Sequence, residues 1–342
     1  MAAVAEQIAS IRARWGKRLV ILGHHYQRSS VLRHADETGD SLELARQAAA
    51  RPEAERIVFC GVRFMAESAD VLTGPGQTVY MPEASAGCPM ADMADAETMR
   101  AAWETLQRAR PGAWLPVVYV NSAAEIKALC GAWGGSTCTS SNAARVFEWA
   151  RSRGKGVFFL PDEHLGRNTA ADLDIAENAV ASYDPQRGDG GLSAETIRRC
   201  EIVVWKGFCR VHTAFTAEQV HRVRRSLPGA SIIVHPEVPL PVVRETDAHG
   251  STSQIIRYVA DAPAGATVVI GTEVNLVSRL AEEHKGRVTV KALSSSVCAD
   301  MARTNEANLL ALLETWPAAC EVHVPESVAE GARQALSRML AL

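Results

Sequence analysis

The sequence predicts an α/β fold built from three similar units, and two observations lead to this prediction. Strand-like apolar runs alternate with amphipathic, helix-like segments along the whole chain, which is typical of parallel sheets whose strands are joined by helices. Polar markers at the ends of these elements recur three times in the same order. The predicted architecture is therefore three short parallel sheets, each with its own helices.

Eight apolar runs have the composition and length of buried strands. They cover residues 18–26, 56–62, 116–121, 156–162, 201–207, 231–238, 266–274 and 287–293. The helices predicted between these strands combine an apolar stripe with a charged face. They include residues 43–50, 123–133, 142–152 and 217–227. An N-terminal helix is predicted before the first strand, and helices over 305–316 and 326–340 follow the last.

Four kinds of marker define each predicted unit. A polar residue ends the first strand, a small hydroxyl residue opens a helix, a third marker follows a second strand, and a cysteine closes the unit. In chain order the three sets are His24, Ser41, Met65 and Cys88, then Asn121, Ser140, Glu163 and Cys209, then His235, Thr252, Glu273 and Cys298.

The spacing of the markers supports the repeat. The first and second markers are 17, 19 and 17 residues apart, the second and third 24, 23 and 21, and the third and fourth 23, 46 and 25. The middle unit therefore carries an insertion, and the Gly- and Asp-rich segment 182–191 is predicted to be a surface loop at this place. The predicted domains are residues 1–100, 101–212 and 213–302, with the C-terminal helices of 303–342 packing near the first.

The composition is that of an ordinary globular protein. The chain has 342 residues, of which 47% are apolar and 22% charged, and this excludes a mainly disordered chain. A formal charge of −3 does not favour a nucleic-acid-binding surface. The N-terminal segment lacks the apolar core of a secretory signal, and no apolar run reaches the roughly 18 residues of a membrane span. We therefore expect a cytoplasmic protein with neither a nucleic-acid nor a membrane partner.

Eight cysteines are unusual in a chain expected to lie in the reducing cytoplasm, where disulfides are rare. The sequence has no C-x-x-C pair, which argues against a structural zinc site. Cys88, Cys209 and Cys298 occupy matching places in the three units, and three thiolates can hold an iron–sulfur cluster with one open iron. Such an iron can act as a Lewis acid on a carboxylate or hydroxyl group. The remaining cysteines are expected to be structural thiols: Cys60, Cys130, Cys138, Cys200 and Cys320. Cys138 is the one rival among them, because it lies by a predicted helix start that could lower its pKa.

The markers also predict where a ligand binds. Ligands of open parallel sheets lie beyond the carboxyl ends of the strands, so three units around a common axis would bring all the marker residues to one cavity. Helix N-termini attract carboxylates and phosphates. The sequence has no P-loop and no G-x-G-x-x-G after a strand. The hydroxyl-bearing helix starts therefore indicate a small substrate with several negative charges.

With these motifs assembled, the sequence resembles the quinolinate synthase family over about residues 18–310. The motifs occur in the order in which the family has them. The matching stretches are LGHHYQ, GDSLELA, VFCGVRFMAESADVL, MPEASAGCPMADM, VVYVNSAAEIKALC, CTSSNA, FLPDEHLGRNTA, WKGFCRVH, HPEVP, GSTSQIIRYV, GTEVNLVSRL and the segment around Cys298.

The resemblance implies a fold, an activity and a cofactor. The implied fold has three three-layer α/β/α domains around a pseudo-threefold axis, with the active site at the centre. The implied enzyme of NAD biosynthesis condenses iminoaspartate (iminosuccinate) with dihydroxyacetone phosphate to quinolinate, phosphate and water. It uses a [4Fe–4S] cluster with one open iron, and an L-aspartate oxidase is the implied supplier of the imine.

The resemblance also assigns residues by position. It makes Cys88, Cys209 and Cys298 the cluster ligands. The residues assigned to catalysis are Tyr26, His212, Glu237, His24 and His235. The residues assigned to substrate binding are His24, Ser41, Tyr119, Val120, Asn121, Ser140, His235, Pro236, Glu237 and Thr252, and Met65 matches an apolar wall. The stretch KGFCRVH departs from the family's common PGYCPVH but keeps the spacing of its Cys and His, and the segment after Cys298 is looser than the family's pattern.

Two other functions fit part of the same pattern. A different [4Fe–4S] hydro-lyase, acting on a small dicarboxylic acid, would use the same thiols and anion sites. A non-enzymatic iron–sulfur redox sensor would use the cysteines, but it would leave the hydroxyl-bearing helix starts and the strand-end histidines without a role. Zinc can also occupy such a thiolate site in a given preparation.

Overall fold

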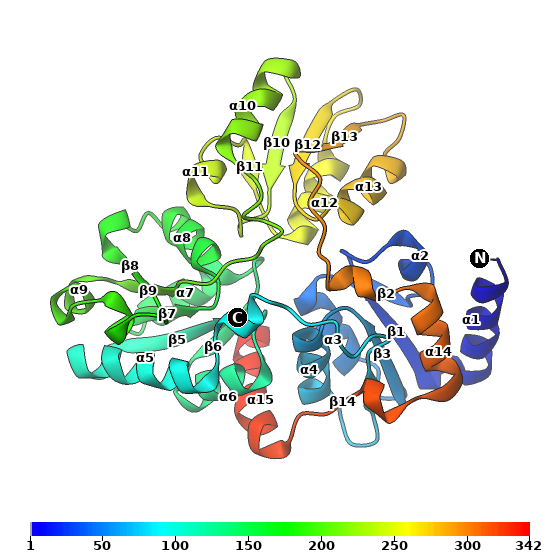
Figure 1. Ribbon diagram of the computed structural model, residues 1–342, viewed down its shortest axis with the longest axis horizontal. Helices are drawn as coiled ribbons and strands as arrows, with labels where there is room; N and C mark the ends of the chain where they lie inside the picture. The colour runs from blue at the N-terminus through cyan, green and yellow to red at the C-terminus, as the bar shows by residue number, and fades with distance from the viewer. Residues whose placement is uncertain (1) are drawn as a thin grey trace.

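The computed structural model describes residues 2–342, and this part of the chain forms three sheets in three lobes around a common centre (Figure 1). Each sheet is accompanied by helices from its own stretch of the chain. The predicted α/β class with short parallel sheets is confirmed. The pseudo-threefold axis and the domain boundaries stay predictions.

The first sheet has the strand order β14-β4-β3-β1-β2. Its strands are β1 (Leu19–His24), β2 (Glu37–Gly39), β3 (Arg56–Cys60), β4 (Thr78–Tyr80) and β14 (Glu321–Val322). Its helices are α1 (Ala2–Trp15), α2 (Ser29–Leu32), α3 (Ser41–Ala49) and α4 (Arg63–Leu72). Every residue of β1 is buried, as expected for a parallel strand that is covered on both faces. β14 returns from the C-terminal region and pairs antiparallel with β4.

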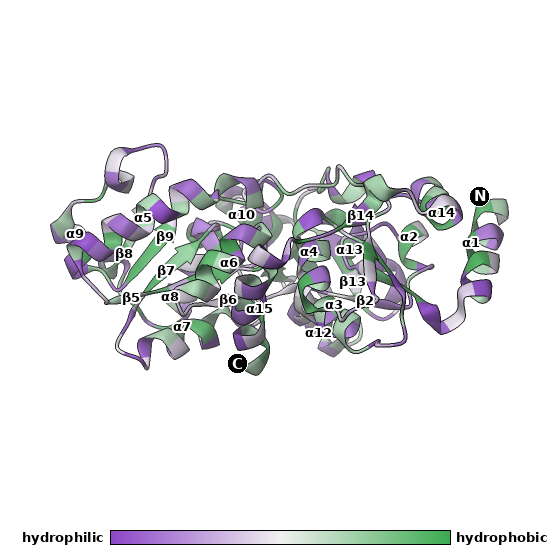
Figure 2. Ribbon diagram, turned by 90° about the horizontal axis from the view of Figure 1, so that it is seen from below, coloured by the Kyte–Doolittle hydropathy of each residue, from purple (hydrophilic) through white to green (hydrophobic). Residues whose placement is uncertain are grey.

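The second sheet has the strand order β6-β5-β7-β9-β8. Its strands are β5 (Trp114–Tyr119), β6 (Ser136–Cys138), β7 (Gly156–Leu160), β8 (Val180–Tyr183) and β9 (Ile202–Trp205). Its helices are α5 (Ala96–Ala109), α6 (Ala124–Ala132), α7 (Ala143–Arg151), α8 (Glu163–Asp172) and α9 (Ala194–Arg199). In Figure 2 these strands are mainly hydrophobic, whereas the helices around them alternate between hydrophilic and hydrophobic residues.

The third sheet has the strand order β11-β10-β12-β13. Its strands are β10 (Ser231–Val234), β11 (Ala248–His249), β12 (Thr267–Gly271) and β13 (Thr289–Ala292). Its helices are α10 (Ala217–Ser226), α11 (Leu240–Val243), α12 (Thr252–Asp261) and α13 (Val274–Glu283). Capping boxes begin α10 at Thr216 and α12 at Ser251, so in both helices the backbone N–H groups of the cap residue and of the third helical residue have partners.

Four strands follow the same order in every sheet. These strands are β2-β1-β3-β4, β6-β5-β7-β9 and β11-β10-β12-β13, and neighbours within each set are parallel. The first marker of each predicted unit lies at or just after the first strand of its sheet. His24 ends β1, Asn121 comes two residues after β5, and His235 directly follows β10. Each repeat of the sequence markers therefore begins at the corresponding strand of its sheet.

The inserted segment 182–191 is only partly a loop. Its first residues complete β8, which pairs with β9 as an additional edge strand. Tyr183 in this strand is buried, and its ring stacks on Trp205 at 5.4 Å between centroids. A turn and the short 3₁₀ helix η4 (Gly188–Gly191) follow. The surface-loop prediction is thus wrong for the start of the segment, because a four-residue edge strand carries too little alternation to be recognised.

The C-terminal helices pack on two different lobes. α14 (Glu306–Thr315) packs on α1, while α15 (Glu326–Ala341) packs on α6 and also contacts α4 (Figure 1). α6 and α15 approach closely because glycines face each other: a Cβ atom built on Gly131 would lie 1.9 Å from the carbonyl oxygen of Gly331. Arg338 of α15 donates to the carbonyl oxygens of Gly131 and Gly135 at 3.2 and 2.6 Å. The last helix therefore joins the first and second lobes.

A buried lysine makes a second connection between these lobes. The Lys127 ammonium donates to the carbonyl oxygen of Phe64 at 3.2 Å, to the Ser68 hydroxyl at 2.9 Å and to the carbonyl oxygen of Ser122 at 2.7 Å. Burial lowers the pKa of Lys127 to about 8. Phe64 and Asn121, which lie on the segments it joins, both line the central cavity described below.

Within residues 2–342, no helix combines the length and the apolar character needed to cross a membrane.

We predict that Gly131→Ala destabilises the protein by about 2 kcal/mol or more, because its methyl group would overlap the backbone of α15. Gly188→Ala is the matched control, since a Cβ atom there meets open space, and we expect a change within about 0.5 kcal/mol. Urea unfolding followed by circular dichroism measures both. Equal stability of the two variants would contradict the close α6–α15 contact.

Candidate functional site

A cavity of about 230 Å³ lies at the centre of the molecule, and residues from all three sheets line it. The residues assigned to catalysis, substrate binding or metal binding all line it except Pro236. The lining residues among them are His24, Tyr26, Ser41, Cys88, Tyr119, Val120, Asn121, Ser140, Cys209, His212, His235, Glu237, Thr252 and Cys298. The Pro236 carbonyl oxygen instead accepts a hydrogen bond from the Asn168 amide at 2.7 Å, which holds the backbone between His235 and Glu237.

Among the markers, Glu163 and Glu273 do not line the cavity, so the prediction that all markers meet in one cavity is wrong for these two. The Glu163 carboxylate bonds Arg167 instead, and the Glu273 carboxylate caps α13 by accepting the Asn275 N–H.

The three cysteines that line the cavity share the same local backbone structure. The carbonyl oxygens of Cys88, Cys209 and Cys298 each accept a hydrogen bond from the backbone N–H four residues later, at 3.1, 2.9 and 3.0 Å. Each cysteine therefore begins a single helical turn, and backbone N–H groups of that turn also point at its sulfur. Cys298, whose surroundings depart most from the family pattern, shares this geometry with the other two.

The three thiols also interact electrostatically. Burial raises the pKa of Cys88 to about 12, and the neighbouring Cys298 adds to this effect. The pKa of Cys209 lies well above its ordinary value, through burial first and then through Glu237 and Cys88. Ionised thiols that lie close together repel one another, so they are stable only beside a cation. A metal-cluster site supplies this positive charge through its metal ions.

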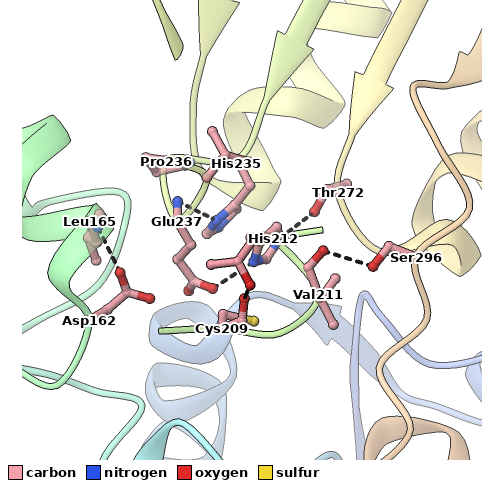
Figure 3. A network of polar contacts seen from close by, with 12 residues as sticks. Asp162, Leu165, Cys209, Val211, His212, His235, Pro236, Glu237, Thr272 and Ser296 are labelled. Carbon is pink, nitrogen blue, oxygen red and sulfur yellow. Dashed lines mark hydrogen bonds and ion pairs between the residues drawn. The ribbon is translucent and has the colours of Figure 1, made fainter. Parts of the chain in front are cut away.

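The loops that carry the three cysteines are tied to one another in a ring. The Trp205 indole N–H, next to the Cys209 loop, donates to the carbonyl oxygen of Met93 beyond Cys88 at 2.8 Å. The Ser296 hydroxyl of the Cys298 loop donates to the carbonyl oxygen of Val211 at 2.8 Å (Figure 3). Arg303 closes the ring by donating to the Ser85 hydroxyl at 3.0 Å. The protein itself thus holds the three thiols near one another.

Two strand-end histidines are fixed as neutral donors. Nδ1 of His24 accepts the backbone N–H of Tyr26 at 3.1 Å, and Nδ1 of His235 accepts that of Glu237 at 3.3 Å. Burial, aided by nearby positive charge, lowers the pKa of each histidine to about 3. A neutral ring whose Nδ1 accepts must carry its proton on Nε2. Both histidines therefore offer an Nε2–H group to a ligand.

Glu237 is the buried charge of the site. One of its oxygens accepts from the Tyr119 hydroxyl at 2.6 Å. The other oxygen bonds Nδ1 of His212 at 2.7 Å (Figure 3). Burial alone would raise the pKa of Glu237. His212 and His235, together with these hydrogen bonds, outweigh burial and lower it below its ordinary value. Glu237 is therefore a carboxylate at neutral pH.

Tyr26 brings a phenol to the same cavity from the first lobe. Its hydroxyl lies 2.8 Å from the Thr272 hydroxyl and accepts from the Thr252 hydroxyl at 3.3 Å. Its ring meets that of His24 edge-on at 4.8 Å between centroids. Burial and the Glu237 charge raise the pKa of Tyr26, so this phenol keeps its proton at neutral pH.

The hydroxyl markers reach the cavity in two ways. Ser41 and Thr252 are the first residues of α3 and α12, as predicted. Ser140 lies in the turn before α7 rather than at its start, because Asn142 is the cap residue of that helix. The helix-start prediction is thus wrong for Ser140, although its side chain lines the cavity.

Sequence reasoning missed other residues at the centre. Asp40, Phe64 and Arg210 line the cavity, and Thr272 lies behind its wall. Two of these four directly precede markers, Asp40 before Ser41 and Thr272 before Glu273, so the repeat itself carried a signal for them. Arg210 directly follows Cys209 and stands where KGFCRVH departs from the family pattern.

A second group of possible metal ligands overlaps the thiol set. Ligand atoms of Cys209, His212 and Glu237 lie within 4.8 Å of one another. Both ring nitrogens of His212 and both oxygens of Glu237 already take part in hydrogen bonds inside the protein. The chemistry of the donors therefore favours the three thiols as the metal-binding set.

A cavity at strand ends that combines three thiols with a buried carboxylate, a phenol and neutral histidines is typical of a metal-dependent α/β enzyme. The family described as NadA, quinolinate synthetase A protein, matches residues 6–341. Quinolinate synthases of Geobacillus sp. (strain WCH70) and of Bacillus subtilis (strain 168) are each 46% identical to this chain, covering 98% of it and 92% of their own length. That of Corynebacterium glutamicum is 46% identical over 96% of this chain and 84% of its own.

The chain therefore belongs to the quinolinate synthase family, whose members are enzymes of NAD biosynthesis. The resemblance seen in the motifs is confirmed.

We predict that acid weakens the fold through His24 and His235. Between pH 6.5 and about 3 the unfolded chain protonates these histidines while the folded protein does not, so stability falls as the pH falls through that window. His24→Asn keeps an acceptor near the Nδ1 position and cannot take up a proton. Its loss of stability between pH 7 and 5 should therefore be smaller than that of the unchanged protein, by up to about 1.4 kcal/mol per pH unit.

Urea unfolding at both pH values, with the proteins in the same state of iron loading, measures this difference. His323→Asn replaces an exposed histidine and serves as the control, and it should leave the pH dependence unchanged. Identical slopes for His24→Asn and the unchanged protein would contradict a buried, neutral His24.

Proposed function

We propose that this protein condenses iminoaspartate (iminosuccinate) with dihydroxyacetone phosphate to quinolinate, phosphate and two waters. One observation carries the proposal: three cysteines in equivalent turns share a single cavity with two neutral histidines and a set of hydroxyl groups. Membership of the quinolinate synthase family supports it. A [4Fe–4S] cluster on Cys88, Cys209 and Cys298 is part of the proposal.

The residues present fit such a cluster. Three thiols face one cavity, and the hydrogen-bonded ring of loops holds them there. When bound, the cluster supplies an iron with an open position, which is a Lewis acid for carboxylate and hydroxyl groups. Backbone N–H groups of the three cysteine turns stabilise the thiolates that would bind it.

Substrate binding uses the polar rim of the cavity. Both substrates are small anions, and Ser41 and Thr252 offer hydroxyl donors beside the free N–H groups of two helix starts. Ser140 and the Asn121 amide extend this surface on the second lobe, where Tyr119 and Val120 form the adjoining wall. Met65 and Phe64 form an apolar wall on the first lobe. This wall limits the water that reaches an unstable imine.

The two neutral histidines act on carbonyl oxygen. His24 and His235 present Nε2–H groups to the cavity, and such donors stabilise negative charge that develops on oxygen during imine formation and isomerisation. Because their pKa values lie near 3, they stay donors of constant charge over the physiological range.

Glu237 and Tyr26 take the two opposite roles in proton transfer, Glu237 as the base and Tyr26 as the acid. The Glu237 carboxylate, with His212 on one oxygen, is the basic side of the site. The Tyr26 phenol holds a proton that it can give to a leaving hydroxyl or to a reacting nitrogen. Aldose–ketose isomerisation and loss of water each need one group that accepts a proton and one that donates a proton. The cavity contains both.

The imine needs a supplier because it hydrolyses in water. We propose that an L-aspartate oxidase makes it and that the reaction takes place in the cytoplasm, where reducing conditions keep free thiols available for a cluster.

Anaerobic turnover tests the proposal. The protein is reconstituted with iron and sulfide and given dihydroxyacetone phosphate together with freshly made iminoaspartate, and quinolinate is measured by chromatography. We expect quinolinate and phosphate in equal amounts. An iron-loaded protein that dehydrates a small dicarboxylic acid but makes no quinolinate would instead establish the hydro-lyase.

We predict that Cys88→Ala, Cys209→Ala and Cys298→Ala each lose the cluster, whereas Cys320→Ala keeps about four irons per chain. Cys320 is only half-buried and lies outside the cavity, so its loss leaves the site intact. Iron analysis and Mössbauer spectroscopy of the reconstituted proteins measure the difference. A Cys298→Ala protein that retains the full cluster would refute the assignment of the third ligand.

We predict that Ser41→Ala raises KM about 10- to 100-fold, because it removes a hydrogen bond to an anionic substrate that is worth about 1.5–3 kcal/mol. Ser29→Ala is the matched control, since Ser29 is also the first residue of a helix but is exposed and lies outside the cavity. Steady-state kinetics on cluster-loaded protein separates the two. An unchanged KM in Ser41→Ala would exclude Ser41 from the binding surface.

A further inference from the structure

Lys127 of α6 is fully buried where the first and second lobes meet, and it does not line the cavity. Its ammonium group donates to the carbonyl oxygen of Phe64 and the hydroxyl of Ser68, both on α4 of the first lobe. It also donates to the carbonyl oxygen of Ser122, just before α6 of the second lobe. A single side chain therefore holds the main chain of both lobes.

The partner on the second lobe, Ser122, closes the turn that carries Asn121. The Ser122 N–H donates to the carbonyl oxygen of Val120 at 2.8 Å, and its hydroxyl donates to that of Tyr119 at 2.9 Å. Ser122 is fully buried outside the cavity, whereas Tyr119, Val120 and Asn121 all line it. The position of Ser122 therefore sets the position of this turn.

The partner on the first lobe, Phe64, belongs to the apolar wall of the cavity. Its carbonyl oxygen also accepts from the Ser68 hydroxyl at 2.7 Å. The Lys127 ammonium lies 5.5 Å from the centroid of the Phe64 ring, a distance at which a cation attracts an aromatic ring. Lys127 therefore connects the apolar wall of one lobe with the polar turn of the other.

A buried charge is a costly way to make this connection. An ammonium group loses its hydration in the interior, and an unbranched apolar side chain would fill the same space without that cost. Burial lowers the pKa of Lys127 to about 8, which is still above neutral pH, so the group keeps three protons for its three acceptors. Glu67 makes another crossing by accepting the Ala124 N–H at 3.1 Å, but this partner lies on α6 and not on the turn.

We propose that Lys127 is a positioning residue for ligand binding: it sets the separation between the Phe64 wall and the Asn121 turn, and with it the width of the cavity across the first two lobes. This inference rests on the proposed function, because the ligands are those of the condensation reaction. Lys127 acts only through the main chain of Phe64 and Ser122. Its loss should therefore weaken the binding of the product quinolinate as well as that of the substrates.

Lys127→Met and Ser68→Ala separate this role from a contribution to stability. Both variants leave buried polar groups of the same cluster without a partner, so both should lower the free energy of unfolding. Only Lys127→Met removes the connection between the lobes, because in Ser68→Ala the ammonium still reaches the Phe64 and Ser122 carbonyl oxygens.

Anaerobic calorimetry at pH 7 measures the Kd for quinolinate, expressed per iron-loaded site so that partial loss of the cluster does not affect it. Misplacement of a group in a site by about 1 Å costs on the order of 100-fold. We expect the Kd to rise about 10- to 100-fold in Lys127→Met and to stay within about twofold of the unchanged protein in Ser68→Ala. Urea unfolding of both variants measures the loss of stability.

A rise of less than about threefold in Lys127→Met, or an equal rise in Ser68→Ala, would overturn the inference. If Lys127→Met does not fold or does not bind iron, Lys127→Arg decides. Its guanidinium keeps the charge and the donors but is larger, so the two carbonyl groups must move apart. A Kd raised more than about threefold in Lys127→Arg but not in Ser68→Ala would support the inference, and any smaller rise would overturn it.

Failure of the proposed function has a different signature, because the unchanged, iron-loaded protein would then neither make nor bind quinolinate.

Discussion

The buried charge of Glu237 is the constraint on which the centre of the molecule depends. An isolated carboxylate in the interior costs several kcal/mol unless hydrogen bonds and opposite charge compensate for it. Its two main partners come from other parts of the chain: Tyr119 ends β5 of the second sheet, and His212 lies between the second and third sheets. Burial raises the pKa of Asp162 well above its ordinary value, and repulsion by the Glu237 charge raises it further.

Satisfying Glu237 orders the remaining polar groups and ties the lobes together. His212 contacts Glu237 through Nδ1 and the Thr272 hydroxyl through Nε2, and the same hydroxyl reaches Tyr26 of the first lobe. A second set of contacts joins the cysteine loops through Trp205, Ser296 and Arg303. The cavity is therefore bounded by groups whose positions depend on one another, so the lobes cannot move apart without leaving buried polar atoms unpaired.

The sequence predicted the parts of this structure that repeat along the chain and missed those that act across it. The eight strands, the α/β class and the gathering of all markers except Glu163 and Glu273 follow from local apolar patterns and from spacing. Lys127 and Gln27 carry no such signal, because partners of theirs are distant in the chain: Gln27, for example, donates to the carbonyl oxygen of Met301, 274 positions away. Ser140 shows a related limit, since spacing located the residue but not the helix boundary.

The three-lobe arrangement also bears on how many ligands a cluster would receive. Each lobe brings one cysteine turn to the cavity, and among the described residues that line it Cys88, Cys209 and Cys298 are the only cysteines. A fourth thiolate would need a fourth equivalent turn, and the remaining perimeter is occupied by histidines, hydroxyl groups and the Glu237 network. On the proposed function, the open position of the iron is thus a consequence of the topology. In that proposal, one turn beyond each of the three sheets would hold the cluster, and the groups between the turns would bind the substrate.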